Sequence, residues 1–282
     1  MPDFEKNVVY GMVSGLALLM DVYRPLSSKH RGIVYINGSG WHSALSYDAA
    51  QLKEAPLGMP YIEKMVANGY TVFAINHRQE PRFRYPAAIE DAQRAVRFVR
   101  HNATAYDIDP DHIGACGGSS GGHLVSLLGT LGGEGSPEDP DPVERESAAV
   151  QCVVARAPIL DLARVISSGA GVVASTADFM GMTPRGEAGA LTTEGRTYAE
   201  ASPITHVSKN TPPFLLIHGS EDVTVPYDQS EIMLDALQSA GVASELLPIP
   251  FAGHGPNFPG ANDPPDYLGA VVRWFDEHLS GA

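Results

Sequence analysis

The chain has 282 residues, of which 44% are hydrophobic and 18% are charged, and its formal net charge is −14. This composition is ordinary for a globular protein and excludes a disordered or fibrous chain. An acidic surface repels phosphate groups, so neither nucleic acid nor an anionic membrane is expected as a partner. We expect a single α/β domain over residues 1–282, because α/β chains of this length often fold as one unit.

The start of the chain indicates a cytoplasmic protein. Its first residues carry no basic cluster of the kind that opens a secretory signal. The most apolar early stretch, Leu16–Met20, is far too short to cross a bilayer. Cys116 and Cys152 lie in apolar runs and are expected to be buried as small hydrophobic side chains, and a disulfide between them is not favoured in the cytoplasm.

Apolar runs alternate with segments of helical period along the chain, which is the order that builds a largely parallel sheet. Residues 16–23 form an early apolar run that we expect to be an antiparallel strand, ended by Pro25. The expected buried strands cover residues 32–36, 70–75, 112–116, 150–154 and 214–217. The expected helices cover residues 86–100, 229–240 and 265–279.

Two stretches fit neither pattern. Residues 131–146 are rich in Gly, Pro and acidic side chains and predict an exposed loop. Residues 161–198 contain scattered glycines and short apolar patches, and we expect them to form an insertion. Long irregular segments in compact domains often act as lids, so this insertion is predicted to be a small cap over a pocket.

The run Cys116–Gly122 follows an expected strand and leads into a helical segment, which is the context of a nucleophile elbow. Small residues are needed two positions before and after the nucleophile, because the turn is sharp. The pattern G-x-S-x-G occurs twice, centred on Ser119 or on Ser120, and the spacing does not separate these registers. The competing interpretation is a glycine-rich turn that binds phosphate, but the Gly-Lys-Ser/Thr ending of such loops is absent.

An elbow serine requires an acid and a base later in the chain, in that order. Asp222 lies in the loop after the expected strand 214–217, and His254 lies between two glycines before the final helix. These two residues are the predicted acid and base. Asp161 also follows a strand and competes as the acid, although we interpret it as a structural or helix-capping residue.

Acyl transfer needs N–H donors for the negative charge that develops on the carbonyl oxygen. The turn after the first core strand offers the backbone N–H groups of Ser39, Gly40 and Trp41, and Ser120 offers its own after the elbow. These four residues form the predicted oxyanion hole. The other histidines show no spacing typical of a metal site, so neither a metal nor a cofactor is predicted.

At these motifs the chain resembles the hormone-sensitive-lipase-like and acetyl-esterase branch of the α/β hydrolases, including bacterial acetylxylan and feruloyl esterases. The resemblance runs from Leu18–Pro25 through Tyr85–Asp91, Ile108–Gly114 and Ala201–Ile204 to the loops around Asp222 and His254. It implies the α/β-hydrolase fold, with a mostly parallel sheet and helices on both faces. The family's elbow matches Ser119–Leu124, which implies that Ser119 is the nucleophile and that Ser120 supplies its backbone N–H.

The chain departs from the resemblance at the oxyanion turn, where Asn37 and Ser39 replace the family's usual histidine and glycine. The expected function is hydrolysis of short-chain carboxylic esters through an acyl-enzyme, with acetyl or feruloyl esters of carbohydrates as candidate substrates. Trp41 and His42 are candidates for stacking on an aromatic or sugar group.

Two alternatives stay open at this point: an amidase of the arylformamidase type and a ligand-binding pseudo-hydrolase. The final helix is expected to be exposed, where it could pair two chains into a homodimer.

Overall fold

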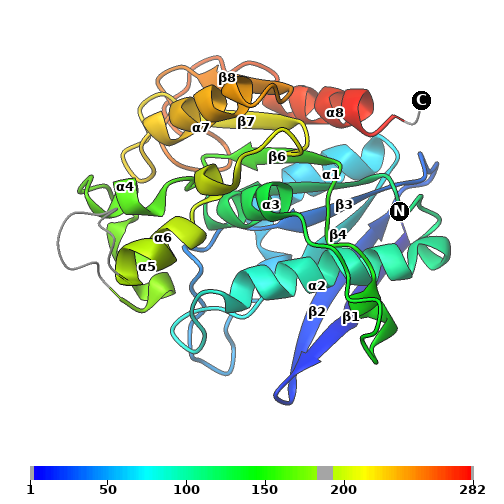
Figure 1. The fold of residues 1–282 in the computed structure, drawn as a ribbon. Coiled ribbons are helices and arrows are strands. Elements are labelled where there is room, and N and C mark those ends of the chain that lie inside the picture. Colours follow the sequence, from blue (N-terminus) through cyan, green and yellow to red (C-terminus); the bar gives the residue numbers. More distant parts are fainter. Residues whose placement is uncertain (1–2, 183–192, 281–282) are drawn as a thin grey trace.

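The computed structural model describes residues 3–182 and 193–280. Its centre is an eight-stranded sheet in the order β1-β2-β4-β3-β5-β6-β7-β8 (Figure 1). The first strand pairs antiparallel with β2, and β2 pairs antiparallel with β4. All the other pairs are parallel. The antiparallel pairing expected for residues 16–23 is therefore confirmed, and the sheet is mixed at this side only.

The five expected buried strands correspond to β3–β7, with boundaries that differ by no more than two residues. Two strands were not predicted, one at each edge of the sheet. The strands are β1 (Asp3–Val13), β2 (Leu16–Arg24), β3 (Arg31–Ile36), β4 (Tyr70–Ile75), β5 (Ile113–Gly118), β6 (Cys152–Arg156), β7 (Phe214–Gly219) and β8 (Ser244–Ile249).

The three expected helices correspond to α2, α7 and α8, and the helical run after the elbow forms α3. The α-helices are α1 (Met59–Ala67), α2 (Ala87–His101), α3 (Ser120–Leu131), α4 (Leu162–Ile166), α5 (Val173–Met180), α6 (Thr193–Glu200), α7 (Asp228–Ser239) and α8 (Tyr267–His278). Short 3₁₀ helices are η1 (Leu52–Glu54), η2 (Pro56–Gly58), η3 (Ala103–Tyr106), η4 (Pro142–Arg145) and η5 (Pro203–His206).

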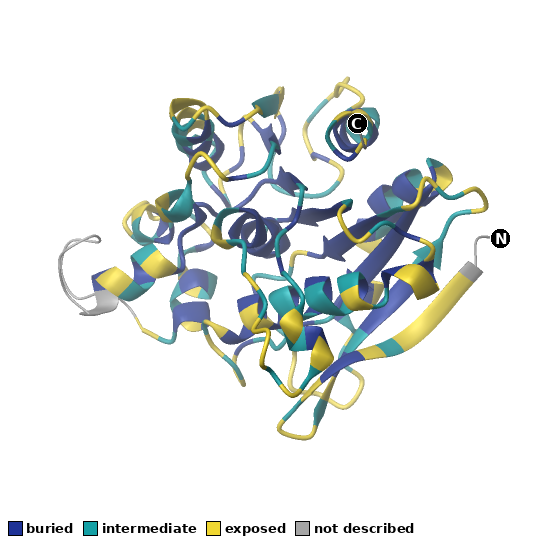
Figure 2. Cartoon of the chain, turned by 45° about the vertical axis from the view of Figure 1, so that its right-hand side comes forward, coloured by how far each residue is buried: buried dark blue, intermediate teal, exposed yellow. Residues whose placement is uncertain are grey.

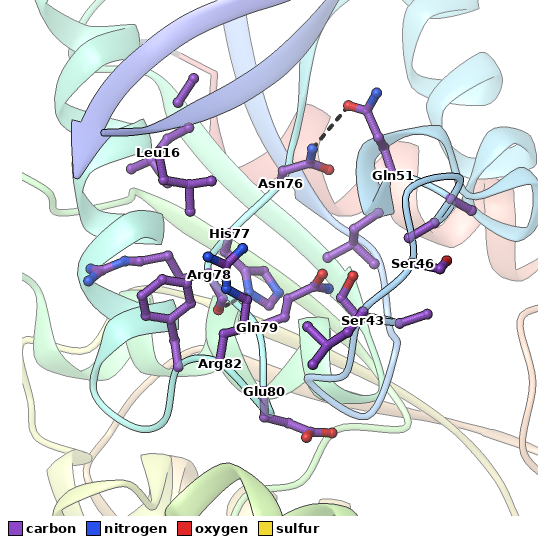
Figure 3. Close-up of a pocket in the computed structure, with 18 of the residues that line it drawn as sticks. Leu16, Ser43, Ser46, Gln51, Asn76, His77, Arg78, Gln79, Glu80 and Arg82 are labelled. Carbon is purple, nitrogen blue, oxygen red and sulfur yellow. Dashed lines mark hydrogen bonds between the residues drawn. The ribbon is translucent and has the colours of Figure 1, made fainter. Parts of the chain in front are cut away.

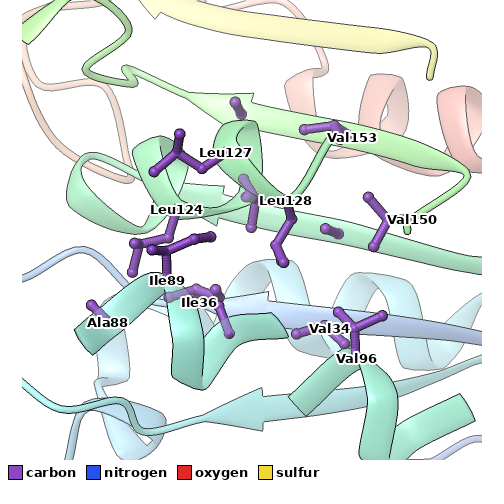
Figure 4. Close-up of a cluster of buried hydrophobic side chains, with 14 of the residues drawn as sticks. Val34, Ile36, Ala88, Ile89, Val96, Leu124, Leu127, Leu128, Val150 and Val153 are labelled. Carbon is purple, nitrogen blue, oxygen red and sulfur yellow. The ribbon is translucent and has the colours of Figure 1, made fainter. Parts of the chain in front are cut away.

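Helices cover both faces of the sheet, and the alternation of side chains along each strand divides the core into two parts. On β3, Val34 and Ile36 face the cluster formed with α2, α3 and α7. Ile33 and Tyr35 face the cluster formed with α1 and α8. Figure 4 shows part of the first cluster, where apolar side chains of α2 and α3 meet those of the strands. The central strands β3–β7 are accordingly buried along most of their length, whereas β8 is only partly buried and β1 is largely exposed (Figure 2).

Residues 131–146 form a connection that is largely irregular, as expected, apart from the end of α3 and the short helix η4. Ion pairs with α2 hold this connection in place: Nη1 of Arg94 on α2 lies 2.6 Å from Oδ2 of Asp141 and 2.8 Å from Oε1 of Glu144. Cys116 and Cys152 are buried and unbonded, in agreement with the sequence. None of the helices in the described part of the chain has the length and apolarity to span a bilayer.

The expected insertion contains regular structure that the sequence did not predict. Within residues 161–198, α4, α5 and the first part of α6 are helical, whereas 183–192 lie outside the described residues. These helices gather at one end of the sheet (Figure 1). Their brevity explains the omission, because five to eight residues are too few for a clear helical period.

The final helix is less exposed than expected. Its apolar residues Val271, Trp274 and Phe275 are buried in the cluster that α8 shares with α1 and the sheet. The apolar face of α8 therefore packs against α1 and the sheet of its own chain and is not free to pair with a second chain. The homodimer stays a prediction.

Candidate active site

Ser119 lies between the end of β5 and the start of α3, in a strained turn. Its φ is 55° and its ψ is −124°, a combination that residues with a side chain rarely adopt. The backbone N–H of Ser119 donates to the carbonyl oxygen of Arg156 at 2.8 Å, which ties the turn to the neighbouring strand. The hydroxyl group is thereby presented at the carboxyl edge of the sheet.

The glycines around this turn distinguish the two registers that the pattern alone left equal. A Cβ added to Gly117 would lie 2.5 Å from the carbonyl oxygen of Gly121, and one added to Gly121 would lie 2.1 Å from that of Ile36. Both contacts are with backbone, which cannot move aside. The glycines of the other register are Gly118 and Gly122. A Cβ added to Gly118 would lie 2.0 Å from Nη2 in the side chain of Arg156, and one added to Gly122 would lie 3.1 Å from the carbonyl oxygen of Arg156. Glycine is therefore required most strictly at Gly117 and Gly121, the positions two residues before and two residues after Ser119.

The structure brings Ser119, His254 and Asp222 together from three separate loops. Nε2 of His254 lies 3.0 Å from Oγ of Ser119, and Nδ1 of His254 lies 2.6 Å from Oδ2 of Asp222. The carboxyl group is fully buried, whereas the imidazole is 20% exposed. One ring nitrogen thus faces a hydroxyl and the other a carboxylate, which is the arrangement that nucleophilic catalysis by serine requires.

The carboxyl group of Asp222 is held in its ionised form. Burial alone would raise its pKa, but hydrogen bonds from His218, His254 and the backbone N–H of Val225 outweigh burial and hold the pKa well below its usual range. Oδ1 accepts from the N–H groups of Thr224 and Val225, each at 2.9 Å. This leaves Oδ2 to face His254.

His218 is part of this arrangement and was not assigned from the sequence. It is fully buried at the end of β7, with Nε2 3.0 Å from the carbonyl oxygen of Val225 and 3.3 Å from Oδ2 of Asp222. Because both are acceptors, Nε2 carries a proton, and Nδ1 accepts from the hydroxyl of Ser230 at 2.7 Å. His218 could have been found from the sequence by its position near the end of an expected strand, four residues before the predicted acid Asp222.

Asp161, the competing acid, lies at the N-cap of α4. Its side chain accepts from the backbone N–H of Arg164 at 2.9 Å, and its own N–H donates to Gln229 at 2.8 Å. These contacts are those of a helix cap. The structure records no contact between Asp161 and His254.

The turn from Ser39 to His42 lies against the elbow. Gly40 and Trp41 have φ values of 66° and 60°, and the N–H of His42 donates to the carbonyl oxygen of Ser39 at 3.3 Å. Positive φ at both central residues is typical of a type I′ turn. The N–H of Ser39 donates to Oγ of Ser120 at 2.9 Å, so the Ser120 hydroxyl has a role that the sequence did not indicate. Ser120 is also the first residue of α3, where the backbone N–H lacks an intrahelical acceptor.

Trp41 anchors this turn and does not face a substrate. Its side chain is fully buried, stacks on Phe179 of α5 at a centroid distance of 4.5 Å, and donates from Nε1 to Nδ1 of His123 at 3.2 Å. His42 contacts Glu80 at 2.7 Å. The expectation that Trp41 stacks on an aromatic or sugar group is therefore wrong, because the indole ring is enclosed between α3 and α5.

Two buried histidines near this turn predict a specific pH dependence of stability. Burial lowers the pKa of His77 and of His123 to about 4. In the unfolded chain an imidazole titrates near 6.5, so between about pH 6.5 and pH 4 only the unfolded state takes up these protons. The free energy of unfolding should fall over this range as pH decreases, by roughly 1.4 kcal/mol per pH unit for each histidine.

Chemical denaturation at pH 7 and pH 5 measures this change. The variant His77→Phe removes one of the two groups and should reduce the pH dependence by about half. A free energy of unfolding that is equal at the two pH values would contradict the assignment of these histidines as neutral in the folded state.

A cavity of 400 Å³, which we call the Ser119 cavity, opens beside the three residues. Ser119 and His254 line it together with Gly40, Arg156 and Ser175 of α5. A separate cavity of 530 Å³ lies between residues 43–52 and 76–83, and Figure 3 shows His77, Gln79 and Glu80 on its wall. Neither Ser119 nor His254 lines this second cavity, so the Ser119 cavity is the candidate site of reaction.

The mixed sheet, the helices on both of its faces and the elbow after β5 define the α/β-hydrolase fold. A solved structure with 28% identity, the acetyl ester-xyloside bifunctional hydrolase from Caldicellulosiruptor lactoaceticus, superposes with a TM-score of 0.74 over 92% of this chain and 88% of that one. A truncated carbohydrate esterase from gut microbiota, also 28% identical, gives a TM-score of 0.74 over 99% of this chain and 97% of that one.

Residues 20–237 match the family model BD-FAE, and the chain belongs to this family. Among curated proteins, it is 31% identical over 200 residues to the probable carboxylic ester hydrolase LipM of Mycobacterium tuberculosis. That match covers 69% of this chain and 44% of LipM. The chain spans about half the length of the mycobacterial relatives that it matches.

Proposed function

We propose that this protein is a serine carboxylesterase that hydrolyses short-chain esters through an acyl-enzyme on Ser119. The observation that carries the proposal is the continuous contact from Ser119 through His254 to Asp222, with distances of 3.0 Å and 2.6 Å. Relatives that are named as a probable carboxylic ester hydrolase and as an esterase support the same class of reaction. The mechanism uses side chains and backbone groups of this chain and one water molecule per turnover.

In the first half of the reaction, Oγ of Ser119 attacks the ester carbonyl carbon while Nε2 of His254 accepts the hydroxyl proton. The tetrahedral intermediate collapses, His254 gives the proton to the departing alcohol, and the acyl group stays on Ser119. In the second half, His254 takes a proton from water while the resulting hydroxide attacks the carbonyl carbon of the acyl-enzyme. The second tetrahedral intermediate then collapses, His254 returns the proton to Oγ of Ser119, and the carboxylic acid leaves. Asp222, ionised throughout, orients the imidazole and stabilises its positive form.

The negative charge on the carbonyl oxygen requires N–H donors beside the elbow. We assign this role to the backbone N–H groups of Ser120 and Gly40. Ser39 and Trp41 belong to the same turn, but the N–H of Ser39 already donates to Oγ of Ser120. Gly40 is supported by its place on the wall of the Ser119 cavity, which Trp41 does not line.

Short acyl groups are proposed because the predicted cap is built from short helices, five residues in α4 and eight in α5, beside a Ser119 cavity of 400 Å³. The α4–α6 segment is proposed as the cap of this single domain, since Val172 and Ser175 lie on the same wall. Two structural relatives are named as an acetyl ester-xyloside hydrolase and a carbohydrate esterase, which supports acyl esters of carbohydrates as the substrate class. The cytoplasmic location stays a prediction.

A series of p-nitrophenyl esters tests this proposal. We expect kcat/KM to be highest with acetate or butyrate and to fall by about tenfold or more with octanoate, because added methylene groups must fit a confined cavity. N-formyl aniline is the comparison substrate. Faster turnover of this amide than of the aryl esters would favour an arylformamidase, and absence of turnover with all of them would favour a pseudo-hydrolase.

A further inference from the structure

Arg156 is the last residue of β6 and lies on the wall of the Ser119 cavity. It is only 8% exposed. It also lies directly beside the elbow, because Gly118 and Arg156 are paired residues of adjacent strands. A Cβ added to Gly118 would lie 2.0 Å from Nη2 of Arg156, so the guanidinium group covers the residue that precedes Ser119.

The guanidinium group of Arg156 is unpartnered. Within residues 3–182 and 193–280 it makes no hydrogen bond or ion pair, and Nη1 is a buried nitrogen without an acceptor. Cζ lies 5.8 Å from the centre of the Tyr61 ring, but a contact with an aromatic face leaves the hydrogen-bond donors unsatisfied. Burying a charge without a counter-charge is strongly unfavourable, so this arrangement requires a reason.

Two other cations that lie wholly or partly inside the described structure have carboxylate partners. Nζ of Lys53, fully buried, lies 2.8 Å from Oδ1 of Asp21. The guanidinium group of Arg78 lies 2.8 Å from Oδ1 of Asp91. The sequence contains 33 acidic residues, so the chain has many carboxylates that could have paired with Arg156. Arg156 differs from both of these cations in having no partner.

The chemistry of the cavity points to an anionic group from outside the chain. Among the described residues that line the cavity, Arg156 is the one side chain with a permanent charge. A planar guanidinium group with free N–H donors binds a carboxylate by two parallel hydrogen bonds. No lining residue is a carboxylate that would repel such a ligand.

We propose that Arg156 is a specificity-determining residue that binds a carboxylate carried by the substrate. The preferred substrates are then esters with a free carboxylate near the scissile bond, either on the acyl group or on the alcohol. Acylated acidic sugars and monoesters of dicarboxylic acids belong to this class. This inference rests on the proposed esterase function and adds the charge of the substrate to it.

Two matched pairs of esters test the inference and distinguish the two positions of the carboxylate. The acyl-side pair is p-nitrophenyl hydrogen adipate and its neutral amide, p-nitrophenyl adipamate. The alcohol-side pair is p-acetoxybenzoate and p-acetoxybenzamide. In at least one pair, kcat/KM of the wild-type protein should be about tenfold or more higher for the acid, mainly through KM, because a charged hydrogen bond is gained.

Variants of Arg156 identify the source of this preference. Arg156→Met should bring the acid-to-amide ratio of kcat/KM close to one, and Arg156→Lys, which keeps the charge without the planar fork, should give an intermediate ratio. Arg273→Met is the matched control, because Arg273 on α8 is exposed and paired with Glu245 at 3.2 Å. This control should retain the wild-type ratio.

A wild-type ratio of one or less in both pairs would overturn the inference, whether or not any variant folds. An acid preference that persists in Arg156→Met would also overturn it. If none of the four esters is hydrolysed, the proposed esterase function fails, and calorimetric titration with adipate and with adipamide then decides on the carboxylate site alone. Binding of adipate that is lost in Arg156→Met supports the site, and absence of adipate binding to the wild-type protein contradicts it.

Discussion

Replacing Ser119 with alanine should lower kcat for ester hydrolysis by about 10⁶-fold, as loss of the nucleophile does in a comparable serine hydrolase. The hydroxyl oxygen lies 3.0 Å from the base, and the described structure offers no other hydroxyl in contact with Nε2 of His254. The fold should be retained, because the strained backbone of the elbow depends on the flanking glycines. Hydrolysis of p-nitrophenyl acetate, with melting temperature measured in parallel, checks this result.

Ser120→Ala is the control for the register of the elbow. The Ser120 hydroxyl accepts from the N–H of Ser39 and therefore supports the turn, but it has no recorded contact with His254. Its removal should cost no more than about 10²-fold in kcat, the lower range for losing one oxyanion donor. If Ser120→Ala were inactive and Ser119→Ala active, the assignment of the nucleophile would be wrong.

Replacing Asp222 with asparagine should lower kcat by roughly 10⁴-fold with little change in KM. Asparagine keeps one oxygen for the N–H groups of Thr224 and Val225, so the loop should persist. The carboxylate that faces Nδ1 of His254 is lost, so the imidazole can take the wrong tautomer and its positive form is not stabilised. Steady-state kinetics with a short-chain ester measures the loss.

Asp161→Asn is the matched control, with the same chemical change at the other candidate acid. Asp161 caps α4, and asparagine is a comparable N-cap residue, so stability should fall by at most about 1 kcal/mol. Turnover should stay close to that of the wild-type protein. An inactive Asp161→Asn together with an active Asp222→Asn would transfer the role of the acid to the loop after β6.

The central part of the fold could be predicted because buried parallel strands are continuous apolar runs. The edges could not. Strand β8 is only partly buried and contains Glu245 and Pro248, so it lacks the apolar run of the central strands. Strand β1 is largely exposed and carries Lys6 and Asn7. Both edge strands are held by hydrogen bonds to a neighbouring strand, β1 to β2 and β8 to β7. A local sequence pattern does not reveal such pairing.

The candidate site shows the same limit. Ser119, Asp222 and His254 could be proposed because each lies in a loop after a strand and their order along the chain is characteristic. The sequence did not show that Trp41 is enclosed by Phe179, because that contact joins residues far apart in the chain. It also did not show that Arg156 is buried without a partner, since a charged residue at a strand end is usually solvated.

The central claim is that Ser119 is a nucleophile activated by His254, and covalent labelling tests it most directly. The wild-type protein is treated with a fluorophosphonate, and the modified residue is located by fragment-ion mass spectrometry of the peptide that contains both elbow serines. We predict one adduct per chain on Ser119, absent in Ser119→Ala and strongly slowed in His254→Ala. An adduct on Ser120, or no labelling of the folded wild-type protein, would contradict the account.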